Sequence, residues 1–499
     1  MTAPNSSNSS LILAKIVKGG STIFFFSLLV SPLGYLIRLL YSRTLSIEDV
    51  GLFYAVIGLI NFLSAYNDLG FGFSVSYFVP KFIKDKNYQK VWTTYKYGQY
   101  LELGTSFVLS LILILLSPWL ASNFFKQPEA EQLVYLLVVY FLAQSFLASL
   151  SKLFNGLQQE KFYASIQFTK LLFTLIFSVI VWLLGVTSAT WYAASWAVGY
   201  SLAAVLYALV MKKTNKYLVS SIIWDPNLFR KMFKFALPAL LGTTITSFIY
   251  STDTIFLTWL RGVREVGIYG VVFALATVSD IFVSPINSLF FPMISQLSHD
   301  RDDANIKKII GVVVKVIPLV SIYFGFFLFI FPASPIQILF GERWVAASEV
   351  PLRWAVLSTP FITLTSYLTT ILGGLGMVKE RLRLAAMVAV ANILLGISLT
   401  SVFGLIGTLA ANIIVYFFSM VLHIILLKKV VDFNLPYFFI LQTSVFLGII
   451  FLLTMITNFY PVSVVDYIAA GIVYSLFFLL FAVITKTINL RQTVMALKS

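Results

Sequence analysis

The chain has 499 residues, of which 59% are apolar and only 11% are charged, and its mean hydropathy is +0.92. Soluble globular domains carry about 25% charged residues, so this composition excludes a soluble protein and predicts an all-α polytopic membrane protein. The sequence contains no cysteine, and its two histidines, His299 and His423, are far apart. These counts exclude thiolate metal sites and disulfides, and we expect neither a metal nor a cofactor.

Apolar runs long enough to cross a bilayer as helices, about 20 residues each, occur fourteen times along the chain. The second and eighth runs exceed this length and contain helix breakers (Gly70 and Gly72; Pro285 and Pro292), so we expect both to be tilted or kinked. No charged loop separates the eleventh run from the twelfth, and their division depends on Gly404. The predicted spans are 16–41, 50–80, 97–120, 133–155, 163–185, 190–211, 235–260, 266–297, 309–331, 351–375, 384–403, 404–427, 437–458 and 464–485.

The net charge is +15, and the lysines and arginines that produce it are distributed unevenly between the loops on the two sides of the membrane. With the amino terminus placed in the cytoplasm, 28 of the 35 lysines and arginines fall on the cytoplasmic side and 7 on the outer side. This is the positive-inside bias. We therefore predict a multi-pass protein of the cytoplasmic membrane with both termini in the cytoplasm. Its basic loops are expected to face anionic membrane lipids and no nucleic acid.

Several landmarks recur at an almost constant spacing, which indicates an internal duplication. Residues 46–54 (SIEDVGLFY) resemble residues 262–270 (GVREVGIYG) at an offset of 216, and the two Lys-Lys pairs at 212–213 and 428–429 have the same offset. Each copy holds six spans, so both copies have the same orientation, as in transporters built of two parallel halves. We predict two parallel six-helix bundles around a central cleft, followed by two further helices: an N-lobe at 1–213, a C-lobe at 214–430, and helices thirteen and fourteen with the tail at 431–499.

A further set of short motifs occurs in order along the chain: Arg38, RTLS at 43–46, EDVGLF at 48–53, DLGFG at 68–72, Asp253 and EVGIY at 265–269. In these motifs the chain resembles the polysaccharide-transporter branch of the multidrug/oligosaccharidyl-lipid/polysaccharide flippase superfamily. The resemblance covers nearly the whole chain. It implies a flippase that moves a polyprenyl-phosphate- or pyrophosphate-linked oligosaccharide to the outer leaflet for polysaccharide or glycan assembly, with glycan-assembly proteins as partners. The sugar composition does not carry over.

Ionisable side chains inside hydrocarbon are costly, and most of them face a bundle interior or an aqueous cavity. Arg38 and Asp253 correspond within one residue under the 216 offset, which predicts equal depth and either an outward gate or a phosphate site. Lys170 and Lys315 lie about 10 Å inside the cytoplasmic boundary by helical rise, where they would attract the phosphates of a lipid headgroup. Snorkelling of the cations and local hydrogen bonds of the carboxylates are the simpler alternatives. The predicted substrate-binding residues are Arg38, Asp68, Lys170, Asp253, Asp280 and Lys315.

Two other functions fit parts of the sequence. A cation-coupled multidrug exporter of the related branch typically has twelve spans and would not need Arg38, Lys170 and Lys315. A membrane glycan polymerase or glycosyltransferase needs catalytic groups on a sizeable extramembrane surface, and the longest outer connection, 332–350, contains no histidine. We therefore expect a transporter and no enzyme. Its coupling ion stays open between a proton and sodium, and the membrane potential could also drive a bound anion outward.

Overall fold

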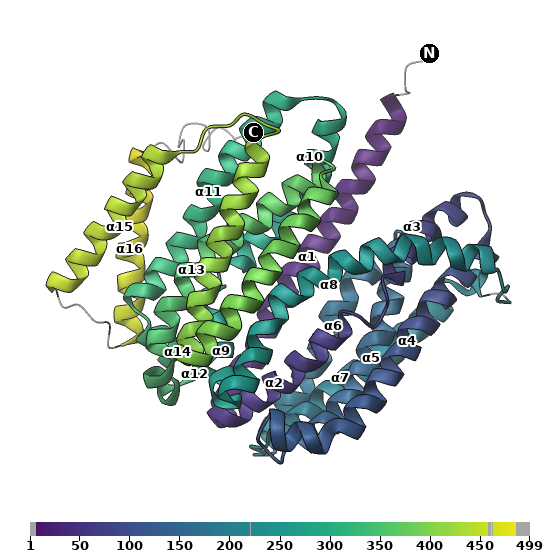
Figure 1. Ribbon diagram of the computed structural model, residues 1–499, viewed down its shortest axis with the longest axis horizontal. Helices are drawn as coiled ribbons and strands as arrows, with labels where there is room; N and C mark the ends of the chain where they lie inside the picture. Colours follow the sequence, from purple (N-terminus) through teal and green to yellow (C-terminus); the bar gives the residue numbers. More distant parts are fainter. Residues whose placement is uncertain (1–5, 220, 458–460, 462, 486–499) are drawn as a thin grey trace. The chain divides into compact units, whose positions relative to one another are not determined.

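The computed structural model describes residues 6–219, 221–457, 461 and 463–485, and every regular element in that part of the chain is a helix (Figure 1). The chain divides into two compact units, Met1–Gly267 and Ile268–Ser499, and the division falls inside one helix, α9. Among the described residues, eleven helices are long and apolar enough to cross a membrane. The predicted helical membrane fold is thus confirmed, whereas the count of fourteen spans and the lobe boundaries stay predictions.

The first unit consists of long apolar helices whose starts are set by polar capping residues. The Ser46 hydroxyl accepts a hydrogen bond from the Asp49 backbone N–H at the start of α2, and the Asp225 carboxylate accepts one from the Leu228 N–H at the start of α8. Its helices are α1 (Ser6–Thr44), α2 (Ile47–Ser64), α3 (Phe71–Lys84), α4 (Tyr88–Trp119), α5 (Ala130–Gly156), α6 (Glu160–Leu183), α7 (Ala189–Thr214) and α8 (Pro226–Arg261), with short turns of π- and 3-10 helix at Leu120–Phe124 and Lys216–Leu218.

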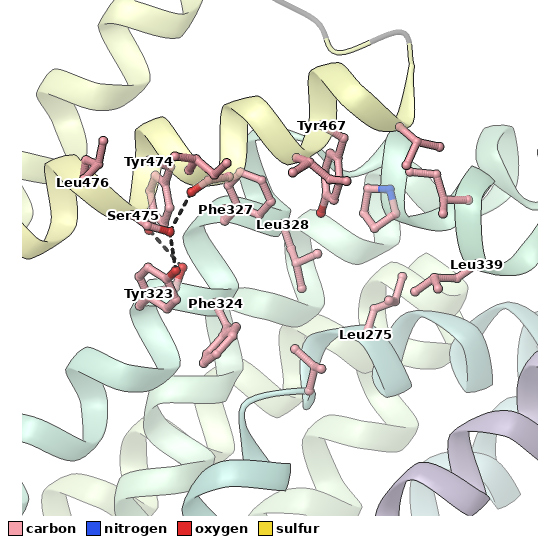
Figure 2. A pocket seen from close by; sticks show the side chains of 17 residues that line it. Leu275, Tyr323, Phe324, Phe327, Leu328, Leu339, Tyr467, Tyr474, Ser475 and Leu476 are labelled. Atoms are coloured by element: carbon pink, nitrogen blue, oxygen red, sulfur yellow. Dashed lines mark hydrogen bonds between the residues drawn. The ribbon is translucent and has the colours of Figure 1, made fainter.

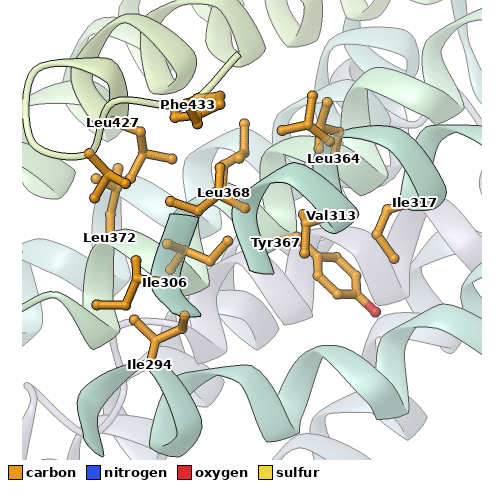
Figure 3. Packing of buried hydrophobic residues seen from close by; sticks show 14 of the residues in the cluster. Ile294, Ile306, Val313, Ile317, Leu364, Tyr367, Leu368, Leu372, Leu427 and Phe433 are labelled. Atoms are coloured by element: carbon orange, nitrogen blue, oxygen red, sulfur yellow. The ribbon is translucent and has the colours of Figure 1, made fainter. Parts of the chain in front are cut away.

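The second unit has its main apolar core among α10, α11, α13 and α14. Figure 3 shows Ile294, Leu368 and Leu427 in this core, each almost completely buried. Its helices are the part of α9 (Val263–Ala276) that follows Gly267, then α10 (Asp280–His299), α11 (Asp303–Ile330), α12 (Ala333–Phe340), α13 (Val345–Gly374), α14 (Val378–Lys428), α15 (Tyr437–Thr457) and α16 (Val464–Ile484), with one 3-10 turn at Glu342–Trp344. The first five residues of α9 belong to the first unit.

Both spans that were expected to kink are broken into two helices. Between α2 and α3 the chain turns through Leu69 and Gly70, which have positive φ angles of 48° and 77°. The eighth predicted span divides into α9 and α10 at residues 277–279. This break lies ahead of Pro285 and Pro292, so the expectation that these prolines mark the kink is wrong. Both prolines lie inside the helical range of α10 instead.

The predicted division at Gly404 is present within α14. Gly404 has φ 59° and ψ −138°, a conformation that interrupts the helix and favours glycine. Across it, the hydroxyl oxygens of Thr400 and Thr408 are 2.8 Å apart, although eight residues of straight helix would separate them by about 12 Å. The chain therefore reverses direction at Gly404, and α14 is a pair of helices.

Candidate functional site

A polar pocket of about 390 Å³ lies inside the first unit among α1, α5 and α6. Lys170 on α6 lines this pocket and is only 6% exposed. Its Nζ donates a hydrogen bond of 2.8 Å to Oε1 of Gln144 and lies 5.0 Å from the centre of the Tyr200 ring. Among the residues that the structure describes, no carboxylate lies within ion-pair distance of this ammonium group. We call this site the Lys170 pocket.

The remaining polar groups of the Lys170 pocket are neutral. Ser27 and Ser31 come from α1, Ser151 from α5 and Gln167 from α6. Hydroxyl and amide groups both donate and accept hydrogen bonds, so such a lining suits a ligand with several hydroxyls. A buried ammonium without a counter-ion is costly, and an anionic ligand would offset that cost. The pocket therefore combines one positive charge with neutral hydrogen-bonding groups.

A cluster of three charged side chains ties α4 and α5 to the break between α2 and α3. Nζ of Lys152 lies 2.9 Å from Oδ2 of Asp68 and 2.9 Å from Oε1 of Glu102. Glu102 is 2% exposed, so its carboxylate is buried. Lys152 had no predicted role because it was counted only among the basic residues of the cytoplasmic side. We call this set the Lys152 cluster.

Two acids share one base in the Lys152 cluster, but their surroundings differ. Asp68 also accepts hydrogen bonds from the backbone N–H groups of Gly70, at 2.8 Å, and Gly72, at 3.3 Å. It therefore caps α3 as well as pairing with Lys152. Its predicted role in substrate binding stays a prediction, and the contacts supply a structural role for it at the helix break.

Two glycines that the 216-residue offset relates, Gly51 and Gly267, meet where α2 and α9 begin. A Cβ added to Gly51 would lie 2.7 Å from the carbonyl carbon of Val263 and 2.9 Å from the nitrogen of Gly267. A Cβ added to Gly267 would overlap the carbonyl oxygen of Ile47. Ile47 and Val263 are themselves 216 residues apart, so the two glycines make equivalent contacts.

An ion pair beside the glycines repeats this relation. Nη1 of Arg264 contacts Oε1 of Glu48, and these residues are again 216 positions apart. Both side chains are about half exposed, so the pair itself adds little stability. The missing side chains of the two glycines allow α2 and α9 to approach closely, and the ion pair lies beside this contact. We call the two glycines and this ion pair the paired-glycine contact.

Arg38 and Asp253 both lie on helices that pack against α2. The guanidinium of Arg38, on α1, lies 5.0 Å from the centre of the Tyr54 ring on α2. Asp253, on α8, is 7% exposed. The next residue, Thr254, packs its methyl group against Gly58 of α2, and a Cβ added to Gly58 would lie 2.7 Å from this methyl group. The two predicted gate residues therefore flank one helix, and the gate remains a prediction.

Asp280, at the middle of the eighth predicted span, is the first residue of α10 and directly follows the break at residues 277–279. Its Oδ1 accepts a hydrogen bond of 3.3 Å from the Thr363 hydroxyl on α13. Asn287, seven residues further along α10, donates to the Ser366 hydroxyl at 3.0 Å. The other predicted acid with a helix break beside it is Asp68, in the first unit.

Lys315 lines a mainly apolar pocket of about 570 Å³ among α11, α13, α14 and α15. Its Nζ lies 4.7 Å from the centre of the Phe439 ring. Lys428 is the second cation among the described residues of this lining. The pocket combines a hydrocarbon wall with positive charge, unlike the Lys170 pocket, whose lining is polar.

A third pocket, of about 680 Å³, lies among α9, α11, α12 and α16 and is lined by aromatic and aliphatic side chains (Figure 2). The hydroxyls of Tyr323 and Ser475 are 2.6 Å apart, and the Tyr474 hydroxyl donates to the Tyr323 carbonyl at 2.9 Å. Because these hydroxyls bond to other groups of the protein, the rest of the pocket lining is mainly apolar and suits a hydrocarbon ligand. No predicted site residue lines this pocket.

Comparison with known proteins gives matches over most of the chain. The family model described as "Polysaccharide biosynthesis protein" matches residues 16–298, and the model described as MatE matches residues 238–399. An uncharacterized membrane protein of Methanocaldococcus jannaschii is 24% identical over 504 residues, which cover 96% of this chain and 97% of that protein.

Two solved structures share the fold. The inward closed conformation of the lipid II flippase MurJ has a TM-score of 0.70 at 18% identity and covers 93% of this chain and 98% of its own. The inward-facing conformation of a multidrug resistance MATE family transporter of the MOP superfamily has a TM-score of 0.64 at 14% identity, covering 80% of this chain and 95% of its own. At these identities the likeness is one of fold.

Proposed function

Because the chain belongs to the family described as polysaccharide biosynthesis proteins, we propose that it flips a polyprenyl-phosphate- or pyrophosphate-linked oligosaccharide across the cytoplasmic membrane. The membrane fold of the flippase superfamily, common to MurJ and MATE transporters, supports transport in general. The cargo, the direction toward the outer leaflet and the cytoplasmic position of both termini are part of this proposal.

The observation that carries the proposal is the Lys170 pocket. A buried ammonium group lowers the free energy of a bound anion and raises that of a bound cation. The neutral serine and glutamine groups around Lys170 can bond sugar hydroxyls. This combination favours an anionic, hydroxylated cargo over the organic cations that a multidrug exporter would carry.

The Lys315 pocket supports a lipid carrier. An anionic headgroup on a hydrocarbon chain needs positive charge beside apolar walls, and Lys315 and Lys428 lie beside such walls. We propose that this pocket holds the phosphate end of the carrier. We propose two separate roles in the transport cycle: the Lys170 pocket binds the hydroxylated part of the cargo, and the Lys315 pocket binds the phosphate end of its carrier.

We propose alternating access as the mechanism, and the paired-glycine contact as a closure that separates when the outer side opens. In the predicted topology, Glu48 and Arg264 are on the outer side. Arg38 and Asp253 lie on the helices next to α2, and we propose that they act in the same movement. Asp68 and Asp280, each at a helix break, are proposed to contribute to coupling of that movement.

The test is a leaflet-transfer assay with purified protein in proteoliposomes. We expect wild type to expose a fluorescent polyprenyl-pyrophosphate glycan to an impermeant quencher, and Lys170→Gln to slow this transfer at least tenfold. Lys161→Gln is the matched control, because Lys161 is an exposed lysine on the same helix. Export of a cationic dye by wild type without transfer of the glycan lipid would refute the proposal and favour the exporter.

A further inference from the structure

We infer that the Lys170 pocket is a subsite for an acidic sugar, in which Lys170 binds a single carboxylate and the neutral groups bind the ring hydroxyls. The inference rests on the proposed function and names the part of the cargo that the pocket takes. The alternative anion is the phosphate of the lipid carrier. Three features of the pocket distinguish the two.

The first feature is the amount of charge. Of the described residues that line the pocket, Lys170 alone is charged. A pyrophosphate bridge carries a negative charge on each phosphorus, whereas a carboxylate carries a single one. One ammonium group therefore balances a carboxylate and leaves a buried pyrophosphate with uncompensated charge, which is costly.

The second feature is the lack of backbone donors. Phosphate sites in proteins commonly use the unpaired N–H groups at a helix N-terminus or the paired donors of arginine. The lining positions on α1 and α5 are in helix interiors, where N–H groups are bonded to the preceding turn. Tyr163 is in the first turn of α6, but its N–H already donates to the Gln159 carbonyl at 3.1 Å.

The third feature is the set of side chains and the size of the pocket. Oε1 of Gln144 accepts the hydrogen bond from Lys170, which fixes the amide so that its NH₂ group can donate elsewhere. Ser27, Ser31, Ser151 and Gln167 add groups that match the alternating donors and acceptors of sugar hydroxyls. A volume of about 390 Å³ is at the small end of the roughly 300–1,000 Å³ of ligand pockets. It suits a sugar unit better than a whole repeat.

Binding to purified protein in nanodiscs tests the assignment with three probes: glucuronate, glucose and inorganic pyrophosphate. We expect glucuronate to bind at least tenfold more tightly than glucose or pyrophosphate, and Lys170→Gln to remove this preference. Lys161→Gln, the exposed control, should keep it. Tighter binding of pyrophosphate that depends on Lys170 would overturn the assignment, and so would equal binding of glucuronate and glucose.

A second variant keeps the test valid if Lys170→Gln folds poorly. Gln144→Glu places a carboxylate beside Nζ of Lys170, where Gln144 now accepts its hydrogen bond at 2.8 Å. This internal carboxylate should compete with the ligand, so glucuronate affinity should fall at least tenfold while the melting temperature is unchanged or raised. Unchanged glucuronate affinity in Gln144→Glu would contradict a carboxylate subsite at Lys170.

Matched lipid-linked glycans separate this inference from the proposed function. We expect wild type to transfer a glycan lipid that contains a uronic acid at least tenfold faster than the same lipid with the neutral sugar. Equal transfer of both would overturn the acidic-sugar assignment and leave the flippase proposal intact. Transfer of neither would refute the flippase proposal itself.

Discussion

Replacing Gly51 with alanine tests whether the paired-glycine contact is a closure. The added methyl group would overlap the carbonyl oxygen of Val263, its nearest neighbour, and would lie 2.7 Å from the carbonyl carbon, whereas ordinary contacts are 3.4 Å or longer. The two backbones must therefore separate by more than about 0.7 Å, the distance that the carbonyl carbon alone requires. Overpacking of a tight contact costs about 1–3 kcal/mol, so the ratio of closed to separated states should fall about 5- to 150-fold.

Crosslinking measures this shift without background because the native chain has no cysteine. We expect the double variant Glu48→Cys/Arg264→Cys to be joined by a short bis-methanethiosulfonate reagent, and the joined protein to stop transferring glycan lipid until it is reduced. Adding Gly51→Ala should lower the crosslinking rate. Gly104→Ala is the matched control, since a Cβ there meets no atom within 4 Å.

Two results would refute this reasoning. If Gly51→Ala crosslinks as fast as the parent and Gly104→Ala, the glycines do not set the approach of α2 and α9. If the crosslinked protein transfers glycan lipid at the rate of the reduced protein, the contact does not separate during transport.

Three further predictions follow from single contacts. Lys152→Met should leave the buried carboxylate of Glu102, and the partly buried one of Asp68, without their ammonium partner and lower the free energy of unfolding by about 3 kcal/mol. Adding Glu102→Gln should restore part of the melting temperature, and equal loss in both variants would contradict the cluster. Gly404→Ala should lower the stability by about 1–3 kcal/mol because its backbone conformation favours glycine, and thermal unfolding beside Gly448→Ala, a helical glycine with open space around it, measures the difference. Lys315→Gln should reduce retention of polyprenyl phosphate in native mass spectrometry at least threefold, and unchanged retention would remove Lys315 from the carrier site.

Much of the fold could be predicted because a helix that crosses the hydrocarbon core of a bilayer must be apolar over about 20 residues. Long apolar segments correspond to the long helices, and the reversal at Gly404 follows from a glycine between two runs that together are too long for one span. The 216-residue offset was likewise readable, and Gly51 and Gly267 occupy equivalent positions in it. The apolar runs, the glycine between them and the repeated spacing can all be read from the sequence without knowledge of how the helices pack.

Side-chain partners could not be predicted in the same way. Lys152 falls among basic residues assigned to the cytoplasmic side, and its pairing with Asp68 and Glu102 depends on how α4 and α5 pack against the α2–α3 break. The position of the break before Asp280 could not be predicted from the prolines, because the turn at residues 277–279 contains none. For Lys170, the sequence predicts only a depth in the membrane, whereas the polar neighbours that α1 and α5 contribute depend on how these helices pack against α6.

Photocrosslinking of the cargo tests the central claim, that the Lys170 pocket holds the sugar of a flipped glycan lipid, most directly. A glycan lipid with a diazirine on its acidic sugar is photolysed with the purified protein in proteoliposomes, and the modified peptides are identified by mass spectrometry. We predict adducts on peptides from α1, α5 and α6 that contain Ser27, Gln144 or Gln167, and their loss in Lys170→Gln. Adducts that avoid these three helices in wild type, or that persist unchanged in Lys170→Gln, would contradict the account.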